Sequence, residues 1–259
     1  MRKFLLFIIL CLGFTNLKAQ LFCPNGYGKY SENLKKYHVT AGYGVTALYG
    51  DVTTSEQFGN AGLVKFDYQI IKGLLVGLEG QFGTLKNIGD NSDRRYVNNK
   101  YKAGGIMLSA HIFDLLLEDR KYTFKSFGEN LLDGIYVGVG ILGVSNKYSS
   151  IFRDDNDYIT YGPIEHDDNG NVIYDNNGRI LFKEKINSIT LPTFNTGIAV
   201  PLISSYKNNN FFSIVLNAQF NLSNNDELDG YIPSDGSGRN ISKKNDVYNL
   251  YSAGLRYSF

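Results

Sequence analysis

The sequence has no tryptophan, and it has only 2 cysteines, 2 methionines and 5 prolines among its 259 residues. Cys11 lies within the first 19 residues, so a chain cleaved after Ala19 keeps only Cys23 and cannot form an internal disulfide. Beyond residue 19 there is no run of about 18 apolar residues, which excludes a membrane-spanning helix in that part of the chain. Any fold must therefore be stabilised without disulfides and without helical spans.

Neither sign of charge is in clear excess. The chain has 26 basic and 25 acidic residues, and loss of residues 1–19 would remove three basic residues and leave 23 against 25. A near-neutral chain lacks the basic excess of nucleic-acid-binding proteins, so we expect no nucleic-acid partner. We also expect no cofactor and no resident metal.

The first 19 residues have the layout of a secretory signal peptide. Arg2 and Lys3 precede an apolar run from Phe4 to Phe14, and a polar stretch then ends at Ala19. A transmembrane anchor is the alternative, but a spanning helix needs about 20 apolar residues, more than this run contains. We therefore predict an exported protein whose signal peptide covers residues 1–19.

Glycine and aromatic residues are abundant: there are 28 Gly, 19 Tyr and 17 Phe. Between Tyr37 and Tyr49 every second residue is aromatic or apolar, while small and polar residues fill the positions between them. Such alternation with a period of two predicts a β-strand. Eight segments show it, and they cover residues 37–49, 62–70, 74–83, 105–113, 134–143, 190–200, 211–222 and 251–259.

The two faces of these strands differ in an unusual way. The apolar face is long and aromatic, whereas the polar face is rich in Gly, Ser, Asn and Gln and carries only isolated charges. Transmembrane barrels place apolar side chains outward into lipid and polar side chains inward. The fold class predicted is an all-β, eight-stranded antiparallel up-and-down transmembrane β-barrel; a soluble β-sandwich is the alternative.

The connections complete this prediction. We expect long outward loops at residues 51–61, 85–100, 146–188 and 223–246, and shorter inward turns at 71–73, 113–133 and 201–210. A three-residue turn at 71–73, with Gly73 in a left-handed conformation, would place Lys65 directly opposite Glu79. The inward connection 113–133 is long enough to hold a short amphipathic segment. In the third outward loop, Asp175–Gly178 should turn a raised hairpin.

Polar residues on the inward face are the candidate site. An eight-stranded barrel has an interior just wide enough for side chains, so charges there must pair and hydrogen-bond. A salt-bridged filling is therefore favoured over a gated pore or proton path. The candidate network consists of Lys65, Asp67, Glu79, Gln81, Ser109, His111, Asn217, Gln219 and Arg256.

Two other kinds of chemistry are weaker alternatives. Ser109 and His111 share a face, and Glu79 could supply an acid, but no nucleophile motif accompanies them, so a hydrolase is the less favoured interpretation. The acidic runs at residues 153–157 and 166–171 lack the spacing of a calcium loop, which favours solvated turns over divalent-ion bridging between loops. Cys23 is expected to be an inert thiol, with an intermolecular disulfide as the alternative.

The C-terminal segment carries a family resemblance. Together with the signal peptide and the eight strands, YSAGLRYSF resembles the small outer-membrane β-barrel proteins of Gram-negative bacteria, the OmpA/OmpX-like group, and the loops rich in Asn, Asp and Tyr resemble barrels from Bacteroidetes. The resemblance implies an assembly signal read by the barrel-assembly machinery, formed by Tyr251, Leu255, Tyr257 and Phe259.

The predicted organisation is a signal peptide at 1–19, a periplasmic segment at 20–35 and an outer-membrane barrel at 36–259. The resemblance implies contact with outer-membrane lipid and lipopolysaccharide, and a monomer is expected. We expect a structural or surface-interaction role with a filled polar lumen rather than catalysis. A narrow, porin-like channel for ions or small solutes is the main alternative.

Overall fold

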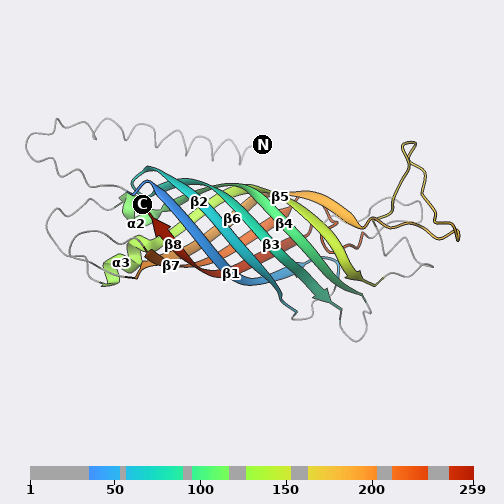
Figure 1. The fold of residues 1–259 in the computed structure, drawn as a ribbon, viewed down its shortest axis with the longest axis horizontal. Coiled ribbons are helices and arrows are strands. Elements are labelled where there is room, and N and C mark those ends of the chain that lie inside the picture. Colours follow the sequence, from blue (N-terminus) through green and yellow to red (C-terminus); the bar gives the residue numbers. More distant parts are fainter. Residues whose placement is uncertain are drawn as a thin grey trace, which may run out of the picture. The chain divides into compact units, whose positions relative to one another are not determined.

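The fold is a closed antiparallel barrel of eight strands in sequence order, with β1 hydrogen-bonded to both β2 and β8 (Figure 1). The computed structural model describes residues 35–52, 57–89, 95–116, 127–152, 163–202, 212–232 and 245–259, so the predicted signal peptide and Cys23 lie outside the described residues. The predicted fold class is confirmed. The strands are β1 Tyr37–Tyr49, β2 Gly59–Ile71, β3 Leu74–Ile88, β4 Tyr96–His111, β5 Ile135–Ile151, β6 Lys185–Pro201, β7 Phe212–Ser223 and β8 Val247–Ser258.

Two short helices mark one end of the barrel, which we call the helix end; the opposite end is the loop end. Helices α2 (Ile112–Leu116) and α3 (Phe127–Gly134) lie in the predicted inward connection, beside the strand end that carries Phe259 (Figure 1). The amphipathic segment expected there is thus helical. None of the helices among the described residues has the length and hydropathy needed to cross a membrane.

The β2–β3 turn follows the sequence prediction. Gly73 has a φ of +74°, and the register shifts by one residue between Gln69 and Ile71, as expected for a tight turn with a bulge. Lys65 consequently pairs with Glu79 across the two strands, which confirms the predicted register.

The strands extend further towards the loop end than predicted. The expected loop at 85–100 is strand up to Ile88 and again from Tyr96, and the expected loop at 146–188 begins only after Ile151 and ends before Lys185. The alternation continues through these extensions, but its polarity reverses. Lys86, Lys100, Lys102 and Lys147 face outward, while Leu85, Val97, Tyr101 and Tyr148 are buried inside.

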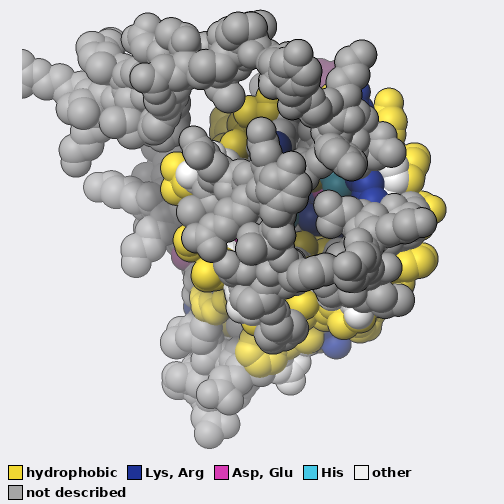
Figure 2. Space-filling model, turned by 90° about the vertical axis from the view of Figure 1, so that its left-hand side faces the viewer, with side chains coloured by type: hydrophobic (Ala, Val, Ile, Leu, Met, Phe, Trp, Pro, Cys, Tyr) yellow, Lys and Arg dark blue, Asp and Glu magenta, His cyan; other side chains and the backbone are white. Residues whose placement is uncertain are grey.

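Hydrophobic side chains form a belt around the outside of the rest of the barrel. Leu78 is 62% exposed, Leu216 50% and Leu255 46%, although all three lie in the middle of strands. Aromatic rings stack at the helix end of the belt, where Tyr37 lies against Phe259 with 5.7 Å between ring centroids. The view onto the helix end shows yellow side chains around the periphery and basic side chains within the ring (Figure 2). This belt is the apolar surface predicted to face lipid.

The interior has two chemically different halves. Towards the helix end it is polar, as predicted. Towards the loop end the predicted polar lumen holds only in part, because a hydrophobic cluster occupies much of the interior beside buried asparagines such as Asn87, Asn99 and Asn146. This cluster consists of Leu48, Val52, Ala61, Leu63, Leu85, Val97, Tyr101, Ala103, Val144, Tyr148, Ile186, Leu228, Tyr231, Tyr248 and Leu250.

Side chains pack closely in the polar half, and this packing allows the inward and outward positions of the strands to be tested. A Cβ atom at Gly77 would lie 2.1 Å from Oδ1 of Asp67, whereas one at the outward Gly80 meets only a carbonyl oxygen at 3.9 Å. We expect Gly77→Ala to lower the free energy of unfolding by about 1–3 kcal/mol, as overpacking does, and Gly80→Ala to change it by less than about 0.5 kcal/mol. Urea unfolding of the refolded protein in micelles measures both, and equal effects would contradict this packing.

Candidate functional site

The polar half of the lumen is built around a buried ion pair. Nζ of Lys65 lies 3.5 Å from Oδ1 of Asp67 and 3.2 Å from Oγ of Ser109. All three side chains are at most 6% exposed. Removing one partner of such a pair typically costs about 3–5 kcal/mol, because the remaining charge stays buried without compensation.

Arg256, the charge within the C-terminal strand, points into the same space. Its Nε donates a hydrogen bond to Oγ1 of Thr40 at 3.3 Å, and its guanidinium lies over the ring of Tyr136 at 5.8 Å from the centroid. The Tyr136 hydroxyl in turn donates to Oδ1 of Asn217 at 2.9 Å. Arg256 therefore ties β8 to β1 and lies against the ring of Tyr136 on β5.

A glutamine links the polar half to the tyrosines above it. Nε2 of Gln81 donates to Glu79 at 2.7 Å and to Gln219 at 3.2 Å. Its carbonyl oxygen accepts hydrogen bonds from the hydroxyls of Tyr101 and Tyr248, both at 3.3 Å. Gln81 thus joins the carboxylate of the polar half to the first layer of the apolar half.

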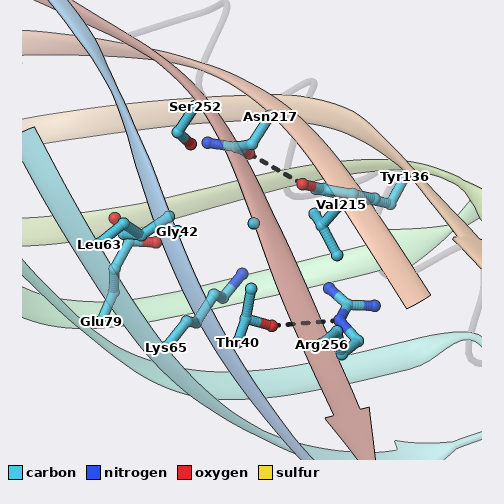
Figure 3. Close-up of a pocket in the computed structure, with 11 residues that line it drawn as sticks. Thr40, Gly42, Leu63, Lys65, Glu79, Tyr136, Val215, Asn217, Ser252 and Arg256 are labelled. Atoms are coloured by element: carbon cyan, nitrogen blue, oxygen red, sulfur yellow. Dashed lines mark hydrogen bonds between the residues drawn. The ribbon is translucent and has the colours of Figure 1, made fainter. Parts of the chain in front are cut away.

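All nine candidate residues lie inside the barrel, and eight of them are buried; Asn217 is half-buried. Of this set, Lys65, Glu79, Asn217 and Arg256 line a cavity with a volume of only about 10 Å³, which is room for no more than one water molecule (Figure 3). Lys65, Glu79 and Arg256 point into it together (Figure 3). This cavity is therefore too small for anything larger than one water molecule.

The hydrolase geometry is absent from the described residues. Nδ1 of His111 is hydrogen-bonded to the carbonyl oxygen of Asp133 at 3.0 Å, and the hydroxyl of Ser109 accepts a hydrogen bond from Lys65. No hydrogen bond joins Ser109 to His111. His111 instead links the end of β4 to Asp133 in α3. Its ring packs against the ring of Tyr136, with 5.4 Å between the centroids.

The loop end is closed by a plug, which we define as Asp226–Tyr231. Leu228 and Tyr231 are fully buried. The carbonyl oxygen of Leu228 accepts hydrogen bonds from the amides of Asn99, at 2.5 Å, and Asn146, at 3.1 Å. The Tyr231 hydroxyl bonds to the carbonyl oxygens of Tyr96 and Phe152, each at 3.0 Å, so the plug is fixed to both β4 and β5.

Two carboxyl groups, that of Asp246 and that of Asp229 within the plug, connect the plug to the barrel. Oδ2 of Asp246 accepts the backbone N–H of Leu228 at 2.6 Å and of Asp229 at 3.0 Å. Oδ2 of Asp229 accepts the backbone N–H of Asp51 at 2.6 Å. A Cβ atom at Gly50 would lie 2.2 Å from Oδ2 of Asp229 and 2.5 Å from Oδ1 of Asp246, so both oxygens border the same point. Glycine at position 50 is what lets the two carboxyl groups approach.

Neither carboxyl group has a cation partner in the described part of the chain. Burial raises the pKa of Asp229 to about 7, and the carboxylates of Asp51 and Asp226 add to the shift. Burial also raises the pKa of Asp246 well above its ordinary value, with a further contribution from Asp229. Within the described residues no group of three or more His, Cys, Asp or Glu side chains is arranged to hold a metal ion.

Beyond the plug, residues 163–184 fold into a small raised structure that we call the knob. Three repeat units spaced eight residues apart begin at Pro163, Asn171 and Arg179, and isolated bridges join Ile164 to Phe182, His166 to Val172 and Tyr174 to Ile180. Each unit thus pairs with both others. The backbone N–H groups of residues 165, 173 and 181 close the same cycle, donating to the carbonyls of 181, 165 and 173.

Two of the three units end in the same turn. Gly170 and Gly178 have φ values of +83° and +78°, and Asp167 and Asp175 accept backbone hydrogen bonds within their own turns. These bonds hold the pKa of each carboxyl below its usual range. The largest contribution comes from the backbone N–H of Asn171 for Asp167 and from that of Arg179 for Asp175. The predicted turn at Asp175–Gly178 is confirmed; the eight-residue spacing of DDNG and DNNG is the signal from which the whole knob could have been predicted.

Comparison with known proteins finds only weak structural similarity. No family model matches the chain, and no curated protein matches it. Among solved structures, Ail of Yersinia pestis in complex with the heparin analogue sucrose octasulfate is 10% identical with a TM-score of 0.42, over 86% of this chain and 98% of that one. Neisserial surface protein A is 13% identical with a TM-score of 0.43, over 86% and 97%.

The outer membrane protein OprG from Pseudomonas aeruginosa is a third such structure, 9% identical with a TM-score of 0.39, over 87% of this chain and 97% of that one. The chain therefore spans most of each of these small barrels at very low identity. The likeness concerns the fold alone.

The carboxyl pair makes plug closure depend on pH. Because both groups bind protons when the plug closes, closure is strongest below about pH 4 and weakens as the pH rises, by about tenfold per pH unit for each group. Asp229 ceases to contribute above about pH 7. We expect amide exchange at Leu228 and Asp229, corrected for intrinsic rates, to report this increase in opening.

In the Asp246→Asn variant the amide nitrogen can take the place of Oδ1 and donate to Asp229. The number of protons that plug closure takes up should therefore fall by one. The double change with Asp229→Asn should abolish the pH dependence. Asp168→Asn, which removes a charge from an exposed turn of the knob, is the matched control and should leave the profile unchanged. Exchange in the native protein that shows no pH dependence after correction would contradict the prediction.

Proposed function

We propose that the chain is an integral outer-membrane β-barrel protein with a sealed lumen, in a structural and surface-interaction role. The observation that carries the proposal is the inverted distribution of side chains around the whole barrel. Exposed hydrophobic side chains form a continuous exterior, and they surround a buried layer of charges. In lipid every backbone N–H and C=O must be paired within the protein, and a closed barrel achieves this. Export through a cleaved signal peptide belongs to the same proposal.

The C-terminal residues support recognition during assembly. Tyr251, Leu255, Tyr257 and Phe259 all face outward and are 39–49% exposed. They present one apolar face of the C-terminal segment, the kind of surface that the barrel-assembly machinery would bind before the barrel closes. Once β8 pairs with β1, the same side chains contact lipid.

The sealed lumen favours the structural role over the channel. The polar half leaves space for one water molecule, the tyrosine layer lies above it, and the plug covers the loop end. The knob and the adjoining loops are then the surfaces left for contact with other molecules. The knob presents Asp168, Asn169, Asn176 and Asn177 at its exposed turns.

A charge placed on the belt tests the membrane location. Leu78→Arg would put a guanidinium into lipid and should lower the free energy of unfolding in bilayers by about 2–4 kcal/mol. In a soluble protein the same exposed position would tolerate arginine within about 0.5 kcal/mol. Leu116→Arg, at a 75% exposed position in α2, is the control and should be neutral. A neutral Leu78→Arg would refute the membrane assignment.

Planar bilayers test the seal. The full mature chain, whose folded state is confirmed by different gel mobility before and after boiling, should give no steady conductance. The physical reason is that ions cannot pass a layer in which Lys65, Glu79 and Arg256 fill the cross-section. Reproducible conductance from the same preparation would contradict the sealed barrel and support the narrow channel.

A further inference from the structure

Lysines cluster on the outward face of the barrel at the edge of the belt. Lys100 on β4 pairs with Lys147 on β5, and Lys147 pairs with Lys185 on β6, so the three lie side by side across three strands. Lys102 lies two residues from Lys100 on the same face. All four are exposed. We call these four residues the lysine patch.

The lysine patch is not neutralised by the protein. None of its side chains forms an ion pair with any carboxylate of the part of the chain that the structure describes. The neighbouring Lys183, by contrast, pairs with Glu227 at 3.7 Å. Like charges directly opposite each other on adjacent strands are destabilising, since their Cβ atoms are only about 5 Å apart. An external anion bound to three such neighbours would therefore relieve their mutual repulsion.

The position of the patch relative to the belt restricts what that anion can be. Lys102 pairs with Phe82 on β3, a belt residue that is 57% exposed. Two residues further from the loop end, Gly104 pairs with Gly80, and beyond it Ile106 pairs with Leu78, which is 62% exposed. The ammonium groups thus lie directly above an apolar surface.

The surface beneath the patch is also unusually bare. Gly80, Gly104 and Gly143 pair in a row across β3, β4 and β5. A Cβ atom at any of them would meet only a carbonyl oxygen, at 3.7–3.9 Å, so space outside the backbone is open. This strip does not itself define a site, but it shows where hydrocarbon chains below a bound headgroup would lie.

We propose that the lysine patch binds the phosphate-bearing headgroup of a membrane lipid, with its acyl chains on the apolar surface beneath. The proposal rests on the membrane location proposed above and names the class of ligand at that surface. Lysine is a compact point charge well suited to phosphate. Its alkyl stem lies along apolar surface while its ammonium reaches the headgroup level. Several adjacent lysines at a membrane surface are typical of recognition of anionic lipid.

The test compares binding of the refolded full chain to lipopolysaccharide and to the same material after removal of its phosphates. The variant carries Lys100→Gln, Lys147→Gln and Lys185→Gln. At about 1 kcal/mol per lysine, its affinity for the phosphorylated lipid should fall about one hundredfold at low salt. The matched control carries Lys35→Gln, Lys36→Gln and Lys72→Gln, which remove the same charge at the helix end, and it should bind as the native chain does.

Three results would overturn the proposal: equal binding by the two triple variants, equal binding of the dephosphorylated lipid, or competition by inorganic phosphate at the same concentration, which would indicate a site for free phosphate. Gel mobility before and after boiling confirms that both variants are folded barrels. Failure of lipid binding in a barrel that Leu78→Arg destabilises in bilayers as predicted would reject this inference and leave the membrane location intact.

Discussion

Closure of the barrel is the constraint on which the rest of the structure depends. The pairing of β1 with β8 leaves every strand hydrogen-bonded on both edges, so the sheet has no row of unpaired backbone groups. With eight strands the enclosed space is narrow, and side chains must fill it. The sequence can then meet both demands only by alternation, with one residue type for the outside and another for the inside.

The interior meets its demand by different chemistry at its two ends. Where the exterior is apolar, the inside holds Lys65, Asp67 and Arg256 in a hydrogen-bonded layer. Where lysines occupy the exterior, the inside contains a hydrophobic cluster with Leu85 and Tyr101 beside buried asparagines such as Asn99. The same eight strands thus have an apolar exterior around a polar interior at one end, and a lysine-bearing exterior around a more apolar interior at the other. Gln81 lies at the boundary and hydrogen-bonds to both sides.

Alternation in the sequence was sufficient to predict the eight strands, the closed fold and the opposition of Lys65 and Glu79, because each depends on local period and on one turn containing Gly73. The strand ends were missed because polarity reverses there: a buried Leu85 beside an outward Lys86 does not continue the pattern of the belt. The plug could not be predicted, since the burial of Leu228 and Tyr231 depends on partners more than 80 residues away in sequence, such as Asn99 and Tyr96.

The knob has a further consequence for how the surface can change. The three units hydrogen-bond in a cycle to one another, and their turns are stabilised by their own aspartates. Replacing Asp168, Asn169, Asn176 or Asn177 would therefore disturb neither the cycle's bridges nor the strands below. These exposed turn positions could therefore vary while the hydrogen-bonded scaffold that displays them stays the same.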